Sequence, residues 1–143
     1  MSPASIAGPH APSGFDPERL AETMKALAKR LTDGGDEAVD AYLDGRDSDP
    51  FDTQWVGADA ALRSHKSRLD AERVARTDAE SAGLRQRIFA AVIQTSGHAD
   101  LAGYLADDAA LIYENDSLNF GSDWIDSLRG RYESQQLPPE PAA

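Results

Sequence analysis

The chain has 143 residues, a length that fits one domain and lets folding bury roughly two-thirds of the unfolded surface. It contains no cysteine, which excludes disulfides, thiolate metal sites and cysteine nucleophiles. The formal net charge is −11. Such a surface repels nucleic acid and anionic lipid and speeds the encounter with a basic protein, although acidity can also serve solubility alone.

The N-terminal residues 1–14 hold three prolines and two glycines but no Lys or Arg. This composition predicts a disordered arm, and it lacks the charged start and apolar run of a signal peptide. No later window has the length and hydrophobicity of a membrane span. We therefore expect a soluble, cytoplasmic protein.

The first helix is expected over residues 17–33. Asp16 can accept hydrogen bonds from free backbone N–H groups at its start, and Pro17 suits the first turn because its missing donor costs nothing there. Gly34 and Gly35 follow as a stop signal. One apolar stripe runs along the helix, made of Leu20, Met24, Leu27 and Leu31.

A shorter helix is expected to begin at Asp36, acting as its cap, and to end at Gly45. Residues 46–52 are predicted to form a loop. Phe51 and Trp55 either anchor this loop to the core or form a contact surface.

Residues 58–77 are expected to form a helix with a narrow apolar strip and many bases. Residues 80–95 form a predicted core helix that ends at Gly97. Gly83 either separates these two helices or is tolerated within one long helix.

Residues 98–106 are expected to form a further short helix, and Asp107 or Asp108 would cap the next one. Residues 115–117 are predicted to be a turn, after which Ser122 caps a last helix. The chain is thus predicted to be all-α: a single compact bundle of six or seven helices over residues 15–137, with a disordered arm 1–14 and a loose tail 138–143.

No catalytic, cofactor or metal site emerges from the pattern. His98 and Asp100 could supply an imidazole beside a carboxylate, but they have no visible nucleophile or third partner. His65 lacks zinc-ligand spacing. The Asp47 to Asp52 segment resembles the start of a calcium loop but lacks its later ligands. We therefore expect a protein that is not an enzyme and binds no cofactor or metal.

The basic residues between 63 and 87 invite a nucleic-acid interpretation. Between residues 51 and 96, however, seven bases stand against six acids, in a chain that is acidic overall. We expect these bases to pair with the acidic elements on either side, within the chain or across a dimer.

The stretch from Ile88 to Leu128 contains seven carboxylates and no Lys or Arg. Much of the core material lies in the same stretch. An acidic run of this length without a balancing cation favours a basic protein partner. Its carboxylates are Asp100, Asp107, Asp108, Glu114, Asp116, Asp123 and Asp126.

Three segments between residues 85 and 138 carry a family resemblance. They are Arg85-Gln-Arg-Ile-Phe-Ala, then Asp100-Leu-Ala-Gly-Tyr104-Leu-Ala-Asp107-Asp108-Ala-Ala-Leu111-Ile112, then Trp124-Ile125-Asp-Ser-Leu128 with Tyr132 and Leu137-Pro138. In this order they resemble the small bacterial immunity proteins found beside polymorphic or contact-dependent toxins. The resemblance implies a binding protein with a toxin as its partner.

Charge and resemblance together lead to the hypothesis of an immunity protein, or antitoxin, that neutralises a basic toxin by direct binding, without nucleic acid or membrane as a partner. The alternatives are a helical scaffold that forms a homodimer or larger oligomer through residues 58–77, and a metal-dependent hydrolase built on His98. The residues predicted to contact the toxin are Asp107, Asp108, Tyr113, Glu114, Asp116, Phe120, Asp123 and Trp124.

Overall fold

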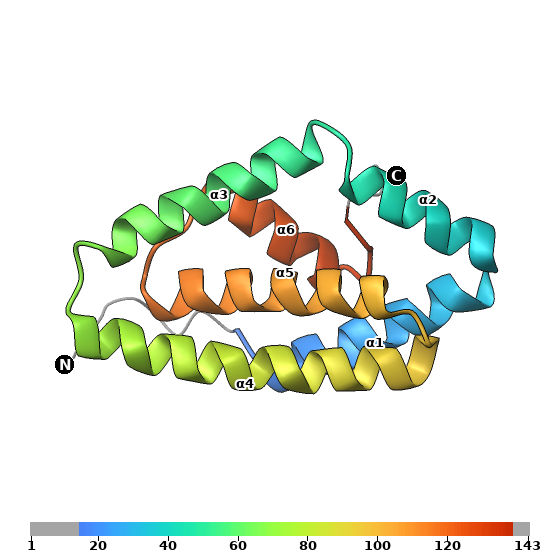
Figure 1. Ribbon diagram of the computed structural model, residues 1–143, viewed down its shortest axis with the longest axis horizontal. Coiled ribbons are helices and arrows are strands. Elements are labelled where there is room, and N and C mark those ends of the chain that lie inside the picture. Colours follow the sequence, from blue (N-terminus) through green and yellow to red (C-terminus); the bar gives the residue numbers. More distant parts are fainter. Residues whose placement is uncertain (1–14, 139–143) are drawn as a thin grey trace.

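The computed structural model describes residues 15–138, which form a compact all-α fold (Figure 1). The prediction of an all-α protein is confirmed. The predicted arm 1–14 and nearly all of the tail 138–143 lie outside the described residues. Six helices make up the described part: α1 (Pro17–Asp33), α2 (Asp36–Arg46), α3 (Phe51–Lys66), α4 (Ala71–Ser96), α5 (Ala99–Ser117) and α6 (Asp123–Glu133).

Helix α1 forms as its sequence predicts. The Asp16 side chain accepts hydrogen bonds from the backbone N–H groups of Glu18, at 3.0 Å, and Arg19, at 3.3 Å. Leu20, Met24 and Leu27 are buried on one face. Local capping and the apolar stripe therefore agree with the tertiary structure here.

The expected helix over residues 58–77 does not exist as one element. Helix α3 already begins at Phe51, within the predicted loop, and ends at Lys66. Asp70 caps a new helix by accepting from the N–H of Arg73 at 3.1 Å. Helix α4 then continues through Gly83 to Ser96, so the chain breaks before residue 71 and tolerates the glycine that looked like a candidate break.

Helix α5 corrects a second expectation. Asp107 and Asp108 cap no helix, and residues 115–117 are not a turn, because α5 is continuous from Ala99 to Ser117. Ala109 and Ala110 are buried, and their small side chains let neighbouring helices approach closely. A continuous apolar path along α5 outweighs the local capping preference of its aspartates.

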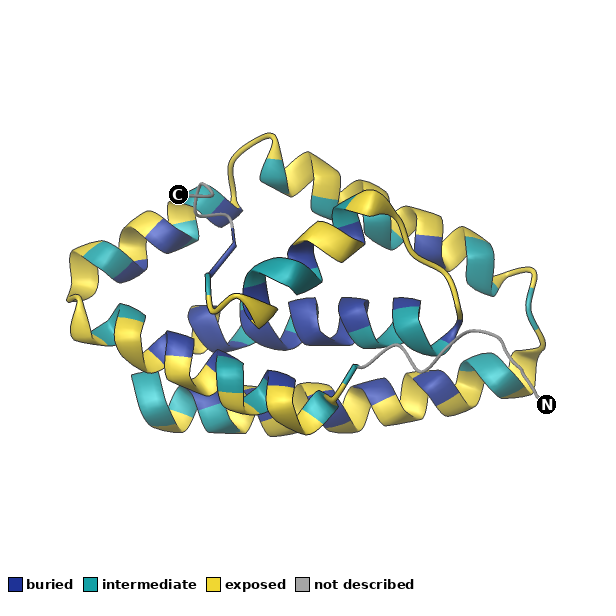
Figure 2. Cartoon of the chain, turned by 180° about the vertical axis from the view of Figure 1, so that it is seen from behind, coloured by how far each residue is buried: buried dark blue, intermediate teal, exposed yellow. Residues whose placement is uncertain are grey.

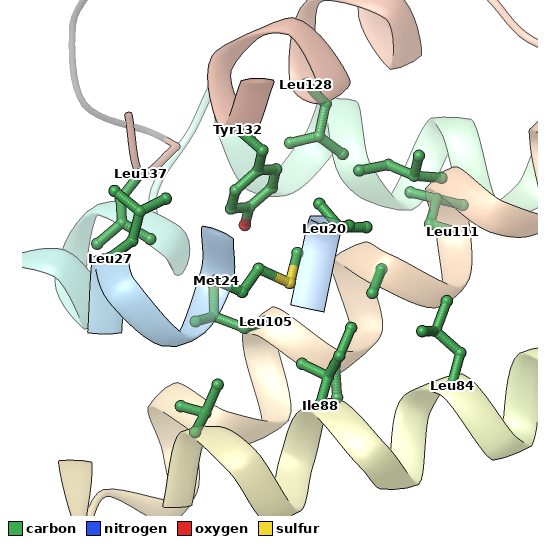
Figure 3. Close-up of a cluster of buried hydrophobic side chains, with 14 of the residues drawn as sticks. Leu20, Met24, Leu27, Leu84, Ile88, Leu105, Leu111, Leu128, Tyr132 and Leu137 are labelled. Atoms are coloured by element: carbon green, nitrogen blue, oxygen red, sulfur yellow. The ribbon is translucent and has the colours of Figure 1, made fainter. Parts of the chain in front are cut away.

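Helix α5 is the central element of the fold. It lies between α4 on one side and α3 and α6 on the other in Figure 1, and most of its length is buried in Figure 2. Side chains from α1, α4, α5 and α6 converge in one apolar core (Figure 3). The core includes Met24, Ile88, Leu105, Leu128 and Tyr132, each 2% exposed or less.

No helix among residues 15–138 is both long enough and apolar enough to cross a membrane.

Two glycine substitutions test this account of α4. Gly83 is exposed in mid-helix with open space where a Cβ would stand, so Gly83→Ala should raise the free energy of unfolding by about 0.5–1 kcal/mol. Gly97 has φ +73° and closes the helix by donating to the Ile93 carbonyl at 2.8 Å. Gly97→Ala should lower that free energy by about 1 kcal/mol. Urea denaturation of both variants measures the two effects. If both substitutions raised, or both lowered, the free energy of unfolding, the assignment of Gly83 to the interior of α4 and of Gly97 to its end would be wrong.

Candidate functional site

A buried ion pair joins α2 to α5. The Arg46 guanidinium donates to both oxygens of the Asp108 carboxylate, each at 2.7 Å. Arg46 is 4% exposed and Asp108 is 0% exposed. This bidentate geometry is the strongest arrangement available to a carboxylate and an arginine.

Aromatic side chains from three further positions complete the network. The Trp55 indole N–H donates to Asp108 at 2.9 Å, and the Tyr132 hydroxyl donates to the other carboxylate oxygen. The Tyr42 hydroxyl accepts from Arg46 at 3.0 Å. The network therefore joins α2, α3, α5 and α6.

The ionisation of these groups suits a structural role. Burial raises the pKa of Tyr132 and of Tyr42, so both phenols stay neutral. Burial by itself would lower the pKa of Arg46, but the adjacent charge of Asp108 raises it overall. The guanidinium is consequently a permanent cation, and the two phenols keep their protons at neutral pH.

Adjacent aspartates provide a matched test of the network. In Asp108→Asn the Arg46 charge stays buried without a counter-ion, so the free energy of unfolding should fall by about 3–5 kcal/mol. Asp107→Asn removes a half-exposed carboxylate from a 3.2 Å pair with Arg85, and should cost at most about 1 kcal/mol. Chemical denaturation compares the two, and similar losses would contradict a special role for Asp108.

The eight residues predicted to contact a toxin do not form one surface. Along α5, Asp107 and Glu114 are seven residues apart and share a face, whereas Asp116 lies on the opposite face. Asp108 is completely buried, so its predicted partner contact is wrong for the folded protein. Its physical role is to neutralise Arg46.

The other predicted contact residues have different environments. Glu114 is mostly buried and accepts from Ser81 at 2.6 Å, and the Tyr113 hydroxyl donates to Glu80 at 2.6 Å. The Phe120 ring is exposed and stacks on His65, with centroids 4.3 Å apart.

Helix α6 carries the last two predicted contact residues. Trp124 is half-buried and donates to Gln54 at 3.1 Å. Asp123 is exposed.

Cations from other helices compensate much of the acidic stretch in α5. Lys66 of α3 pairs with Glu114, Arg85 of α4 with Asp107 at 3.2 Å, and Arg129 of α6 with Asp116 at 3.7 Å. The prediction that the basic residues of 63–87 pair with neighbouring acids is thus confirmed within one chain for Lys66 and Arg85.

Lys66 illustrates how tightly one of these pairs is held. Burial by itself would lower the pKa of Lys66, but its hydrogen bonds to Asp78 and Glu114 outweigh burial and raise the pKa. The charge of this lysine is therefore engaged within the fold.

The exposed negative charge is concentrated elsewhere, over residues 36–52. This segment has seven acids, all exposed, and its one base, Arg46, is buried against Asp108. We call these seven acids the α2–α3 acidic surface. The signal was present in the sequence as seven acids against one base, but Arg46 fell in the predicted loop 46–52 and nothing in its position indicated that it would be buried. The surface consists of Asp36, Glu37, Asp40, Asp44, Asp47, Asp49 and Asp52.

Within residues 15–138, no three His, Asp or Glu side chains are grouped so as to hold a metal ion.

A small hollow adjoins the acidic surface between the start of α3 and the N-terminal half of α5. Its volume is about 230 Å³. The lining residues are Arg46, Phe51, Asp52, Trp55, Val56, Tyr104 and Asp107.

A compact helical fold with an acidic face and a small hollow suits a protein that works through contacts at its surface. Comparison with protein families identifies the family: the chain belongs to the family described as immunity protein PIM1, which it matches over residues 21–139. The resemblance seen over residues 85–138 is confirmed and extends over most of the chain. Neither the curated proteins nor the solved structures contain a match to this chain.

Proposed function

We propose that this immunity protein neutralises a basic bacterial toxin by binding it directly in the cytoplasm. Membership of the immunity protein PIM1 family supports a toxin as the partner. The observation that carries the basic character of that partner is the α2–α3 acidic surface, whose seven carboxylates are exposed while its single Arg is buried and neutralised.

The α2–α3 acidic surface replaces most of the contact surface expected from the sequence. Carboxylates already paired to Lys66, Arg85 or Arg129 offer less free charge to a partner. On α2, by contrast, Asp36, Asp40 and Asp44 recur every four residues and are all exposed, whereas Val39 and Tyr42 are buried. One stripe of negative charge therefore faces outward from the fold.

The proposed mechanism is non-enzymatic. The negative surface attracts the toxin and covers a basic site by which the toxin would hold an anionic substrate. The same charge disfavours nucleic acid and anionic membrane as partners. Of the contact residues expected from the sequence, Asp107 adjoins this surface and stays within the proposal.

The scaffold alternative loses its predicted surface. It required residues 58–77 to form one exposed helix, whereas the chain breaks between Lys66 and Ala71. Whether the protein forms a homodimer is tested by measuring its mass in solution.

The charge mechanism predicts strong salt dependence. The rate of association with the toxin encoded by the neighbouring open reading frame should fall at least about tenfold between about 0.01 M and 1 M salt, because the Debye length shrinks from about 30 Å to about 3 Å. Stopped-flow or surface-based kinetics measure this rate. The dissociation rate should change less.

Co-expression supplies the matching test in cells. Cells producing the toxin should grow when this protein is present and stop growing when it is absent. If the association rate did not depend on salt but the cells were still protected from the toxin, the electrostatic mechanism would be wrong and direct binding would remain. Absence of both binding and protection would overturn the proposed function.

A further inference from the structure

The hollow beside the α2–α3 acidic surface has rigid aromatic walls. The Trp55 indole is fixed by its 2.9 Å hydrogen bond to the buried Asp108. The ring centroids of Phe51 and Tyr104 each lie 4.7 Å from the Arg46 guanidinium carbon. The buried ion pair thus holds these walls in place before any partner arrives, which reduces the entropy lost on binding.

Tyr104 also connects the hollow to the acidic surface. Its hydroxyl donates to Asp47, and this hydrogen bond, together with burial, raises the pKa of Tyr104 to about 12. The phenol is therefore a stable donor at neutral pH, and it holds the Asp47 carboxylate next to Tyr104, one of the residues that line the hollow.

The hollow is apolar inside and negative at its edge. Val56 is 56% exposed, the most exposed of the large apolar residues in the described chain. Asp52 is exposed and has no ion pair with another of residues 15–138. The positive charge of Arg46 does not offset it, because Asp108 already neutralises that charge.

Asp107 stands on the α5 side of the hollow. Partial burial raises its pKa even though Arg85 lies 3.2 Å away. Its carboxylate is therefore incompletely stabilised, and an additional cation would stabilise it. Arg85 is itself half exposed, so solvent screens this pair and weakens it.

The size of the hollow restricts what can enter. Small-molecule and cofactor sites usually have volumes of about 300–1,000 Å³, and this hollow has about 230 Å³. One long side chain fits that space. An aliphatic stem suits the apolar walls, and a cationic end suits the carboxylates.

We propose that the hollow receives a Lys or Arg side chain of the toxin, with its stem against Trp55 and Val56 and its charge between Asp52 and Asp107. This inference rests on the proposed function and locates the centre of the toxin-binding surface. The α2–α3 acidic surface then steers the toxin toward the hollow, where the aromatic walls exclude water around the bound cation.

Two pairs of exposed substitutions in the full chain test the site against the same neighbouring toxin. Asp52→Asn removes one carboxylate from the first turn of α3, and Asp126→Asn makes the same change in the first turn of α6. Val56→Arg places a cation at the hollow, and Ala26→Arg places one on the exposed face of α1. Thermal unfolding of each variant checks that the fold is retained.

The expected result is a rise of at least about tenfold in Kd for Asp52→Asn and for Val56→Arg. The two controls should change Kd less than about twofold. Asp52→Asn should also reduce the dependence of Kd on salt more than Asp126→Asn does, because a specific ion pair is lost in addition to the same net charge.

Other outcomes overturn the proposal in distinguishable ways. Loss of affinity in Val56→Arg without loss in Asp52→Asn would indicate an apolar contact with no bound cation. If Asp52→Asn and Val56→Arg both bound the toxin as tightly as the wild type, the binding surface would lie elsewhere and the proposed function would still stand. A wild-type dimer that becomes monomeric in Val56→Arg would assign the hollow to a second copy of this chain. Wild-type protein that does not bind the toxin would overturn both proposals.

Discussion

The bidentate pair between Arg46 and Asp108 is the constraint on which the rest of the structure depends. Removing two charges from water is costly, and good alignment together with further hydrogen bonds offsets that cost. Trp55 and Tyr132 satisfy the carboxylate, and Tyr42 accepts from the guanidinium. The buried Nε of Arg46 has no hydrogen-bond partner among residues 15–138. Because these residues come from four helices, neutralising one buried aspartate fixes how α2, α3, α5 and α6 meet.

The same pair decides where the molecule is negative. With Arg46 turned inward, the segment from Asp36 to Asp52 has no accessible base. Helix α5 shows the opposite pattern, because Lys66, Arg85 and Arg129 reach its acids from other helices. A run of acids in the sequence is therefore a poor guide to exposed charge, since cations distant in the chain can lie next to it.

The buried pair also links stability to the proposed binding surface. Phe51 and Tyr104 pack on the Arg46 guanidinium, and Trp55 hydrogen-bonds to Asp108. The groups that hold the helices together are thus also the groups that shape the hollow. An interface built on such a rigid support loses little conformational freedom on binding.

Local chemistry in the sequence determined several helix ends, the all-α class and the overall acidity. Asp16, Gly97 and Ser122 act within a few residues of themselves, so their capping roles were predictable. The order of residues between 85 and 138 was likewise sufficient to indicate an immunity protein.

Tertiary structure alone decided how the acids of α5 are used. Arg46 and Asp108 are 62 residues apart in the chain, and nothing in the local pattern of either residue indicates the other. From the sequence, Asp108 had the features of a helix cap. In the folded protein it is buried in the middle of α5, where it neutralises a buried cation. Long-range pairing of this kind depends on how helices pack, and the helix-by-helix pattern of a single sequence does not contain that information.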